Sequence, residues 1–176
     1  TIAQIEGRAG GGGSEFAASM DMRFGVIDKT RINQMEVPLG ILPGGTGTQR
    51  LPRLVGRARA MEIILGGEDL DAATAERWGY LNRIYPADQI SAAVAALAQR
   101  IASFPQPALR LAKAAINASS APLKEGLQEE AYLFARLLRT EEAQENMRKF
   151  LQIGGQTREG ELKVDELAAR LGELKD

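Results

Sequence analysis

Residues 10–21 read Gly-Gly-Gly-Gly-Ser-Glu-Phe-Ala-Ala-Ser-Met-Asp, a glycine run that enters a short helix-forming segment. Glu15 falls in the first turn of that segment, where the helix dipole favours a negative charge. Glycines at a helix N-terminus leave backbone N–H groups free and let a ligand approach the backbone closely. The stretch therefore predicts a site for an anion, or for an oxygen that becomes anionic during a reaction. A carboxylate one turn away could move a proton beside it.

Two simpler interpretations of the glycine run stay open at this point. A polyglycine segment can be a plain loop. It can also be artificial, because Ile5-Glu6-Gly7-Arg8 resembles a protease-cleavage tag and residues 10–14 resemble a flexible linker.

Composition excludes several classes of function. The chain has 176 residues, 44% of them hydrophobic, which suits one domain with a real core, or one domain with an appendage. A net charge of −1 gives no electrostatic argument for binding nucleic acid or an acidic membrane surface. No apolar run reaches membrane-spanning length, and no secretory signal is recognisable.

Cysteine and histidine are both absent from the sequence. Their absence rules out disulfides, thiolate metal sites, cysteine nucleophiles and imidazole bases or ligands within this chain. Proton transfer must therefore use carboxylates, lysine, tyrosine or water.

Alternating and periodic patterns predict the order of the elements. Strands are expected at 1–5, 22–27 and 80–85, and the first of them begins so abruptly that the chain is expected to start partway through a larger fold. Helices are expected at 57–65, 71–78, 87–104, 109–118, 123–138 and 141–153, with a linker at 154–160 and a short last helix at 164–171. Asp71 is expected to cap its helix and Gly79 to end it, and Thr46 or Thr48 is a candidate cap for a further helix.

Glu36 is a carboxylate placed between the apolar residues Met35 and Val37. It can be a solvated loop acid, or it can be a carboxylate poised for acid–base chemistry. A second glycine-rich turn follows at 43–51, and it lacks the lysine of the Walker pattern, which excludes nucleotide hydrolysis.

From residue 87 the composition shifts to alanine, leucine, glutamate and arginine, which predicts a helical appendage. In its helix at 123–138 we expect a buried apolar stripe made of Leu127, Ala131, Phe134 and Leu138. Such stripes can form an internal core or a subunit interface, and the sequence leaves both open.

Taken in series, these motifs resemble the enoyl-CoA hydratase/isomerase (crotonase) family. The resemblance rests on the following segments: Gly11-Gly12-Gly13-Ser14-Glu15, Asp21, Met35-Glu36 with Leu39-Gly40, Pro43 to Leu51, Arg53 to Gly56, Ala60-Met61-Glu62, and Ala75 to Leu81. Their order and spacing fit from Thr1 to about Phe150. The resemblance implies an α/β fold, with a crotonase-like ββα spiral core that lacks its N-terminal part at 1–86. A helical oligomerisation domain at 87–153 and a linker with a short tail helix at 154–176 would follow.

The resemblance also implies chemistry at a coenzyme A thioester. Members of this family bind the thioester oxygen with two backbone N–H groups, and by position Gly12 would supply one of them. Glu15 and Glu36 would be the two catalytic carboxylates, which together deliver a proton and activate a water. No metal and no cofactor other than the coenzyme A of the substrate is expected, and the residues that bind coenzyme A are not identified.

Retention of both acids favours a hydratase, because relatives that shift a double bond match only at the Glu36 position. An isomerase or another acyl-CoA activity of the family stays open, as does a truncated, non-catalytic interaction module. The family's other half carries the second oxyanion N–H and most coenzyme A contacts, so this segment alone is expected to be inactive or nearly so. That half would be absent, disordered or on another chain. A cytoplasmic enzyme of fatty acid metabolism is expected, as a homotrimer or a hexamer, with no nucleic acid or membrane partner.

Overall fold

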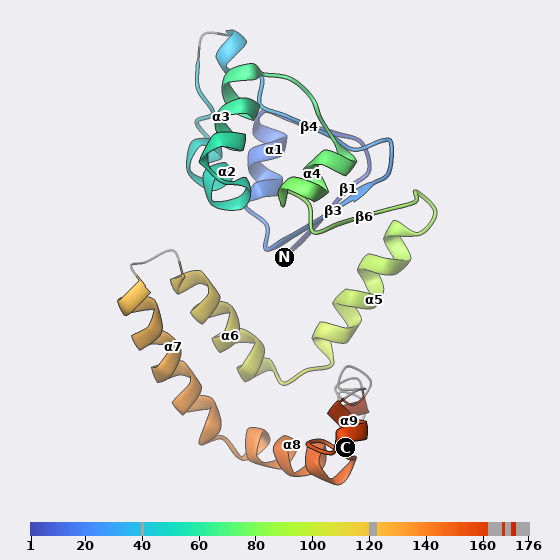
Figure 1. The fold of residues 1–176 in the computed structure, drawn as a ribbon, viewed down its shortest axis with the longest axis vertical. Coiled ribbons are helices and arrows are strands. Elements are labelled where there is room, and N and C mark those ends of the chain that lie inside the picture. Colours follow the sequence, from blue (N-terminus) through green and yellow to red (C-terminus); the bar gives the residue numbers. More distant parts are fainter. Residues whose placement is uncertain (40, 120–122, 162–166, 168–169, 172–176) are drawn as a thin grey trace. The chain divides into compact units, whose positions relative to one another are not determined.

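The computed structural model describes residues 1–39, 41–119, 123–161, 167, 170 and 171. The chain divides into two compact units, residues 1–95 and 96–176 (Figure 1), which are taken one at a time. The division falls inside a helix, α5 (Ile90–Ala102). The three-part division at 1–86, 87–153 and 154–176 stays a prediction.

Two small sheets form the first unit. One sheet has the strand order β1-β3-β6 and the other has β2-β4-β5. The strands are β1 (Ile2–Ile5), β2 (Arg8–Gly10), β3 (Met22–Val26), β4 (Arg31–Asn33), β5 (Leu70–Asp71) and β6 (Arg83–Tyr85). All pairs are parallel except β4 with β5, which is antiparallel.

Successive turns of the chain add one strand to each sheet. Ile2 pairs with Met22 across β1 and β3, and Arg8 pairs with Arg31 across β2 and β4. Parallel neighbours need a crossover connection between them, and α1 (Gly12–Ala18) supplies it here. Arg8 and Gly10 belong to a paired strand, and Gly12 begins α1. The glycine run is therefore a folded connection between strands. It is neither a free linker nor an unstructured loop.

Three further helices and a short 3-10 helix complete this unit (Figure 1). They are η1 (Val37–Leu39), α2 (Gly47–Val55), α3 (Arg57–Gly66) and α4 (Ala72–Trp78). Their apolar faces meet the sheets in one core, whose fully buried members include Ile32, Leu51, Ala75 and Tyr80. Burial of such side chains is the main favourable contribution to folding.

The caps of α4 agree with the sequence prediction, whereas the N-cap of α2 differs from it. Asp71 caps α4, where its Oδ1 accepts from the Thr74 backbone N–H at 2.7 Å, and Gly79 ends it at φ 89°, as predicted. Thr46 does occupy the N-cap of α2, but its backbone is left-handed (φ 91°) and its side chain caps nothing. The first N–H of α2, from Gly47, instead donates to the carboxylate of Glu15.

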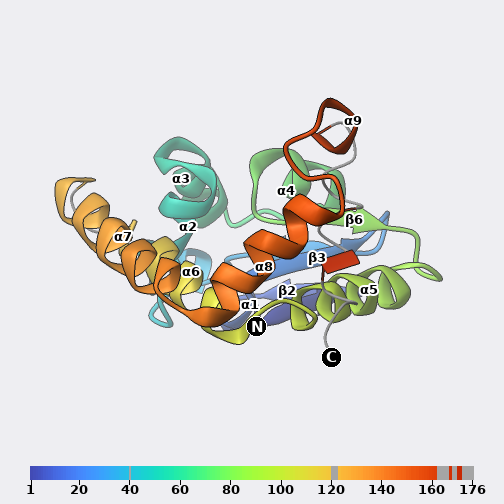
Figure 2. The same cartoon turned by 90° about the horizontal axis from the view of Figure 1, so that it is seen from below.

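Helices make up the second unit. After α5 come α6 (Gln106–Ala118), α7 (Leu123–Leu138), α8 (Glu141–Gln152) and α9 (Arg158–Glu161). Figure 1 and Figure 2 both show α6 and α7 side by side, and an apolar cavity of about 480 Å³ lies between their side chains. α6 begins earlier than predicted because Pro107 lies in its first turn, where proline is tolerated.

Within this chain, the predicted stripe of α7 is not buried where its side chains are described. The side chains of Phe134 and Leu138 are 61% and 38% exposed, and among the described side chains of α7 it is Leu133 that is buried. Periodicity places an apolar stripe on a helix without saying whether another part of the same chain covers it. Leu127 and Ala131 lie outside the described side chains, as do most residues of the predicted helix at 164–171.

Candidate active site

The glycine run makes a tight entry into α1. Gly11 has φ 54° and ψ −128°, a backbone conformation that favours glycine, and a Cβ there would lie 3.1 Å from the Oε1 atom of Glu36. The Gly11 N–H donates to the Asn33 carbonyl oxygen at 3.0 Å, which continues the β2 and β4 pairing. A Cβ on Gly12 or Gly13 would meet no atom within 4 Å, so this entry is open at its next two residues.

The N–H of Gly12 belongs to the first turn of α1, where backbone donors have no partner within the helix. Within the described part of the chain it makes no hydrogen bond. Gly12 thus has the open surroundings and the unused donor that binding an oxyanion requires.

Glu15 is buried, with 5% of its surface exposed, and points to the start of α2. Its Oε1 atom accepts from the Gly47 N–H at 2.7 Å. Cβ atoms built on Gly45 and Gly47 would lie 2.6 Å and 2.9 Å from its carboxylate oxygens. The second glycine-rich turn therefore wraps around a carboxylate, a role that its sequence did not indicate.

Glu36 is also buried, at 9% exposed, so the interpretation as a solvated loop acid is wrong. The side-chain amide of Gln34 lies against it. With its nitrogen toward Glu36, the amide donates to the Oε2 and Oε1 atoms at 2.9 Å and 3.2 Å. We assign this orientation because the opposite one would place the amide oxygen against two carboxylate oxygens.

A buried polar chain extends from Gln34 to Tyr80. The amide oxygen of Gln34 accepts from the Ser14 Oγ atom at 3.1 Å. The Tyr80 hydroxyl donates to the Ser14 carbonyl oxygen at 2.9 Å and lies 3.1 Å from Ser14 Oγ. Sequence reasoning missed Gln34, Ser14 and Tyr80 as members of one group, because no spacing rule joins residues 66 positions apart.

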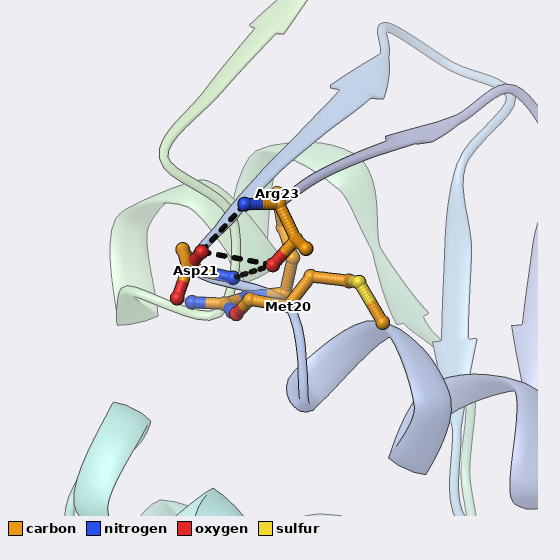
Figure 3. A network of polar contacts seen from close by, with 4 residues as sticks. Met20, Asp21 and Arg23 are labelled. Atoms are coloured by element: carbon orange, nitrogen blue, oxygen red, sulfur yellow. Dashed lines mark hydrogen bonds and ion pairs between the residues drawn. The ribbon is translucent and has the colours of Figure 1, made fainter. Parts of the chain in front are cut away.

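Arg23 holds Tyr80 from its other side. Its Nε atom donates to the Tyr80 carbonyl oxygen at 2.7 Å, and its guanidinium lies 5.7 Å from the centre of the Tyr80 ring. Figure 3 shows Arg23 beside Met20 and Asp21, where its Nη1 atom donates to the Met20 carbonyl oxygen at 2.7 Å. Burial lowers the pKa of the Arg23 guanidinium from its ordinary value.

These contacts bring the sequence-predicted residues to one end of α1. Gly12 and Glu15 lie in its first turn, and Glu36 lies against Gly11 just before that turn. Their catalytic roles stay predictions. In the described ranges no three acidic side chains gather in a way that could hold a metal ion. The helices described there also include none long and apolar enough to cross a membrane.

Comparison with known proteins identifies the family. The model of the enoyl-CoA hydratase/isomerase family matches residues 1–156. The chain belongs to this family. The family resemblance of the motifs is thereby confirmed.

Curated hydratases are similar to most of this chain. A probable enoyl-CoA hydratase (echA8) of Mycobacterium tuberculosis is 42% identical over 153 residues, which cover 86% of this chain and 59% of the relative. A probable enoyl-CoA hydratase of Rhizobium meliloti is 43% identical over 152 residues, which cover 85% of this chain and 58% of the relative. The chain thus spans somewhat more than half the length of the curated relatives it matches.

Solved structures of the family confirm the fold. An enoyl-CoA hydratase structure from Geobacillus kaustophilus superposes with a TM-score of 0.82 at 38% identity, covering 86% of this chain and 59% of that one. The predicted α/β crotonase-like fold is therefore correct for the matched residues.

Tyr80 gives this member of the family a measurable pH signature. Burial raises the pKa of its phenol above the ordinary value, so the folded chain keeps a proton that the unfolded chain releases near pH ~10. The stabilising contribution is complete below that pH and is lost as the pH rises toward the folded pKa. Urea unfolding between about pH 9 and 11 is expected to show a steeper loss of stability in the wild type than in Tyr80→Phe. Equal slopes in the two proteins would contradict the assignment of Tyr80 as a buried neutral phenol.

Proposed function

We propose that the protein is an enoyl-CoA hydratase, a lyase that adds water to the double bond of a 2-enoyl-CoA thioester. The observation that carries the proposal is the pair of buried carboxylates, Glu15 and Glu36, at the end of α1 where Gly12 has an unused N–H. Buried acids beside an open backbone donor are the groups that hydration of a conjugated thioester needs.

In the proposed reaction, the Gly12 N–H donates to the thioester oxygen and stabilises the negative charge that develops there. The oxygen of one water bonds to the β-carbon, and the α-carbon receives a proton. Glu15 and Glu36 handle this water together, one taking a proton and the other delivering one. The Gly47 N–H and the Gln34 amide keep both carboxylates in place during these transfers.

An isomerase is the second candidate, because a relative from Mycosarcoma maydis with 37% identity carries the name enoyl-CoA isomerase/hydratase. Moving a double bond requires one acid, whereas this chain holds two. The organised surroundings of Glu15, with Gly45 and Gly47 fitted against its carboxylate, favour hydration. Another acyl-CoA activity of the family, or a non-catalytic interaction module, would leave that arrangement unused.

The proposal also covers the substrate, the oligomeric state and the cellular location of the enzyme. Its partner is an acyl-CoA thioester, with coenzyme A as part of the substrate and no separate cofactor. The exposed apolar side chains of Phe134 and Leu138 suit a helical interface between copies, consistent with a trimer or a dimer of trimers. We place the enzyme in the cytoplasm, in the metabolism of fatty acids.

The experiment that tests the function follows the loss of the conjugated absorbance of crotonyl-CoA. The 176-residue chain is assayed alone and mixed with the part of the Mycobacterium tuberculosis relative that it does not match. We expect faster hydration in the mixture than by the 176 residues alone, because a second oxyanion donor is worth on the order of 3 kcal/mol of transition-state stabilisation.

Product analysis separates the two candidates, because a hydratase yields the 3-hydroxyacyl thioester and an isomerase yields a shifted double bond. Ordinary hydratase rates from the chain alone would refute the expected dependence on a second segment. No turnover in either sample, with no thioester binding by calorimetry, would refute the proposed function and favour the interaction module.

A further inference from the structure

We propose that Tyr80 is a positioning residue for Glu36, and that it acts through Ser14 and Gln34. This inference rests on the proposed function, in which Glu36 is one of the two acids. Tyr80 itself lies two residues beyond the end of α4, and among the described residues its hydroxyl contacts Ser14 rather than either acid. Its hydroxyl instead ends a buried chain of hydrogen bonds whose other end is the carboxylate.

The direction of that chain follows from counting donors and acceptors. The NH₂ group of Gln34 faces both carboxylate oxygens of Glu36, at 2.9 Å and 3.2 Å, and carboxylate oxygens accept hydrogen bonds. That orientation leaves the amide oxygen of Gln34 facing Ser14 Oγ at 3.1 Å. Because an amide oxygen can only accept, Ser14 must donate its single hydroxyl proton to Gln34.

Tyr80 completes the count. With its proton committed, Ser14 Oγ can only accept, so the single proton of the Tyr80 hydroxyl is shared between Ser14 Oγ, 3.1 Å away, and the Ser14 carbonyl oxygen, 2.9 Å away. Every hydrogen bond in the chain then points from Tyr80 toward Glu36. Hydrogen bonds aligned in one direction polarise one another, and such a network is sensitive to the loss of any member.

Tyr80 is well suited to be the fixed end of this chain of hydrogen bonds. Its side chain is fully buried, and Arg23 holds both its carbonyl oxygen and the face of its ring. Gln34 and Ser14 are likewise fully buried, so water cannot replace a missing partner without entering the core. A small displacement of Ser14 would pass directly to Gln34 and from there to the carboxylate.

The first test observes Gln34 directly and does not depend on activity. In the full chain, Tyr80→Phe removes one oxygen and keeps the ring, and Tyr85→Phe is the matched control, since in the described residues the Tyr85 hydroxyl makes no hydrogen bond. We expect the side-chain amide of Gln34, followed by NMR, to exchange with solvent about two- to tenfold faster in Tyr80→Phe, the factor that one lost hydrogen bond represents. Ser14→Ala should have the same effect, and Tyr85→Phe none. An unchanged Gln34 amide in Tyr80→Phe would overturn the proposal.

The second test uses the preparation that hydrates crotonyl-CoA. We expect Tyr80→Phe to lower kcat about tenfold with little change in KM, because misplacing an acid slows the chemical step more than binding. In a Glu36→Gln background the same change should alter the rate by less than about twofold, since Tyr80 acts only through the carboxylate. A purely structural role would lower the rate equally in both backgrounds, and that result would overturn the proposal. Absence of hydration by the wild type would refute the proposed function instead, and the NMR result alone would then decide the inference.

Discussion

Replacing Glu36 by glutamine is expected to lower the hydration rate about 10³-fold, within the range that general acid–base catalysis contributes. The substitution keeps the size of the side chain and removes its ability to exchange a proton. It also places an amide against the amide of Gln34, which can still be satisfied by reorientation. The free energy of unfolding should therefore change little. The main change should be a slower loss of crotonyl-CoA absorbance.

The matched control for this prediction is Glu62→Gln, which makes the same chemical change at an exposed position on α3. We expect wild-type turnover from the control, and thioester binding by calorimetry within a few-fold of wild type from both variants. A Glu36→Gln enzyme that keeps more than about a tenth of the activity would show that this carboxylate is not an essential proton carrier.

Gly47→Ala is expected to displace the other acid, with a loss of about 1–3 kcal/mol in the free energy of unfolding. The added Cβ would lie 2.8 Å from Pro43 Cβ and 2.9 Å from the Oε1 atom of Glu15, closer than real Cβ atoms come. Pro43 is buried and cannot move freely, so Glu15 must give way and its hydrogen bond from the Gly47 N–H must lengthen. We expect hydration to fall about 10²-fold from this misplacement.

Gly44→Ala provides the comparison within the same turn. Gly44 is exposed, and a Cβ there would meet only the Leu42 carbonyl oxygen, at 4.0 Å. Urea unfolding and the crotonyl-CoA assay should place this variant near wild type. If Gly47→Ala matched it in both measurements, the glycine-rich turn would have no part in holding Glu15.

Local chemistry explains what the sequence could predict. The helix start after the glycine run, the first-turn position of Glu15, the Asp71 cap and the Gly79 stop each depend on residues close together in the chain, and the structure confirms these four features. The family resemblance then connected Glu15 with Glu36, and the comparison with known proteins confirmed the family.

Features that depend on distant partners escaped prediction. Nothing in the spacing of Ser14, Gln34 and Tyr80 says that they share hydrogen bonds, because the fold alone brings them together. The N-cap of α2 failed for the same reason, since a carboxylate from another helix takes the place of the Thr46 hydroxyl. For Phe134 and Leu138 the periodicity predicted a buried stripe, yet both side chains are exposed within this chain. The described residues do not cover them.

The order of strands in the β1-β3-β6 sheet has a kinetic consequence. β1 and β3 are joined by a short crossover, whereas α2, α3 and α4 lie between β3 and β6 along the chain. Closing the longer loop costs more chain entropy, so we expect β6 to dock last. Tyr80 lies three residues before that strand, so we expect its hydrogen bonds to Ser14, and with them the support of Glu36, to form late in folding.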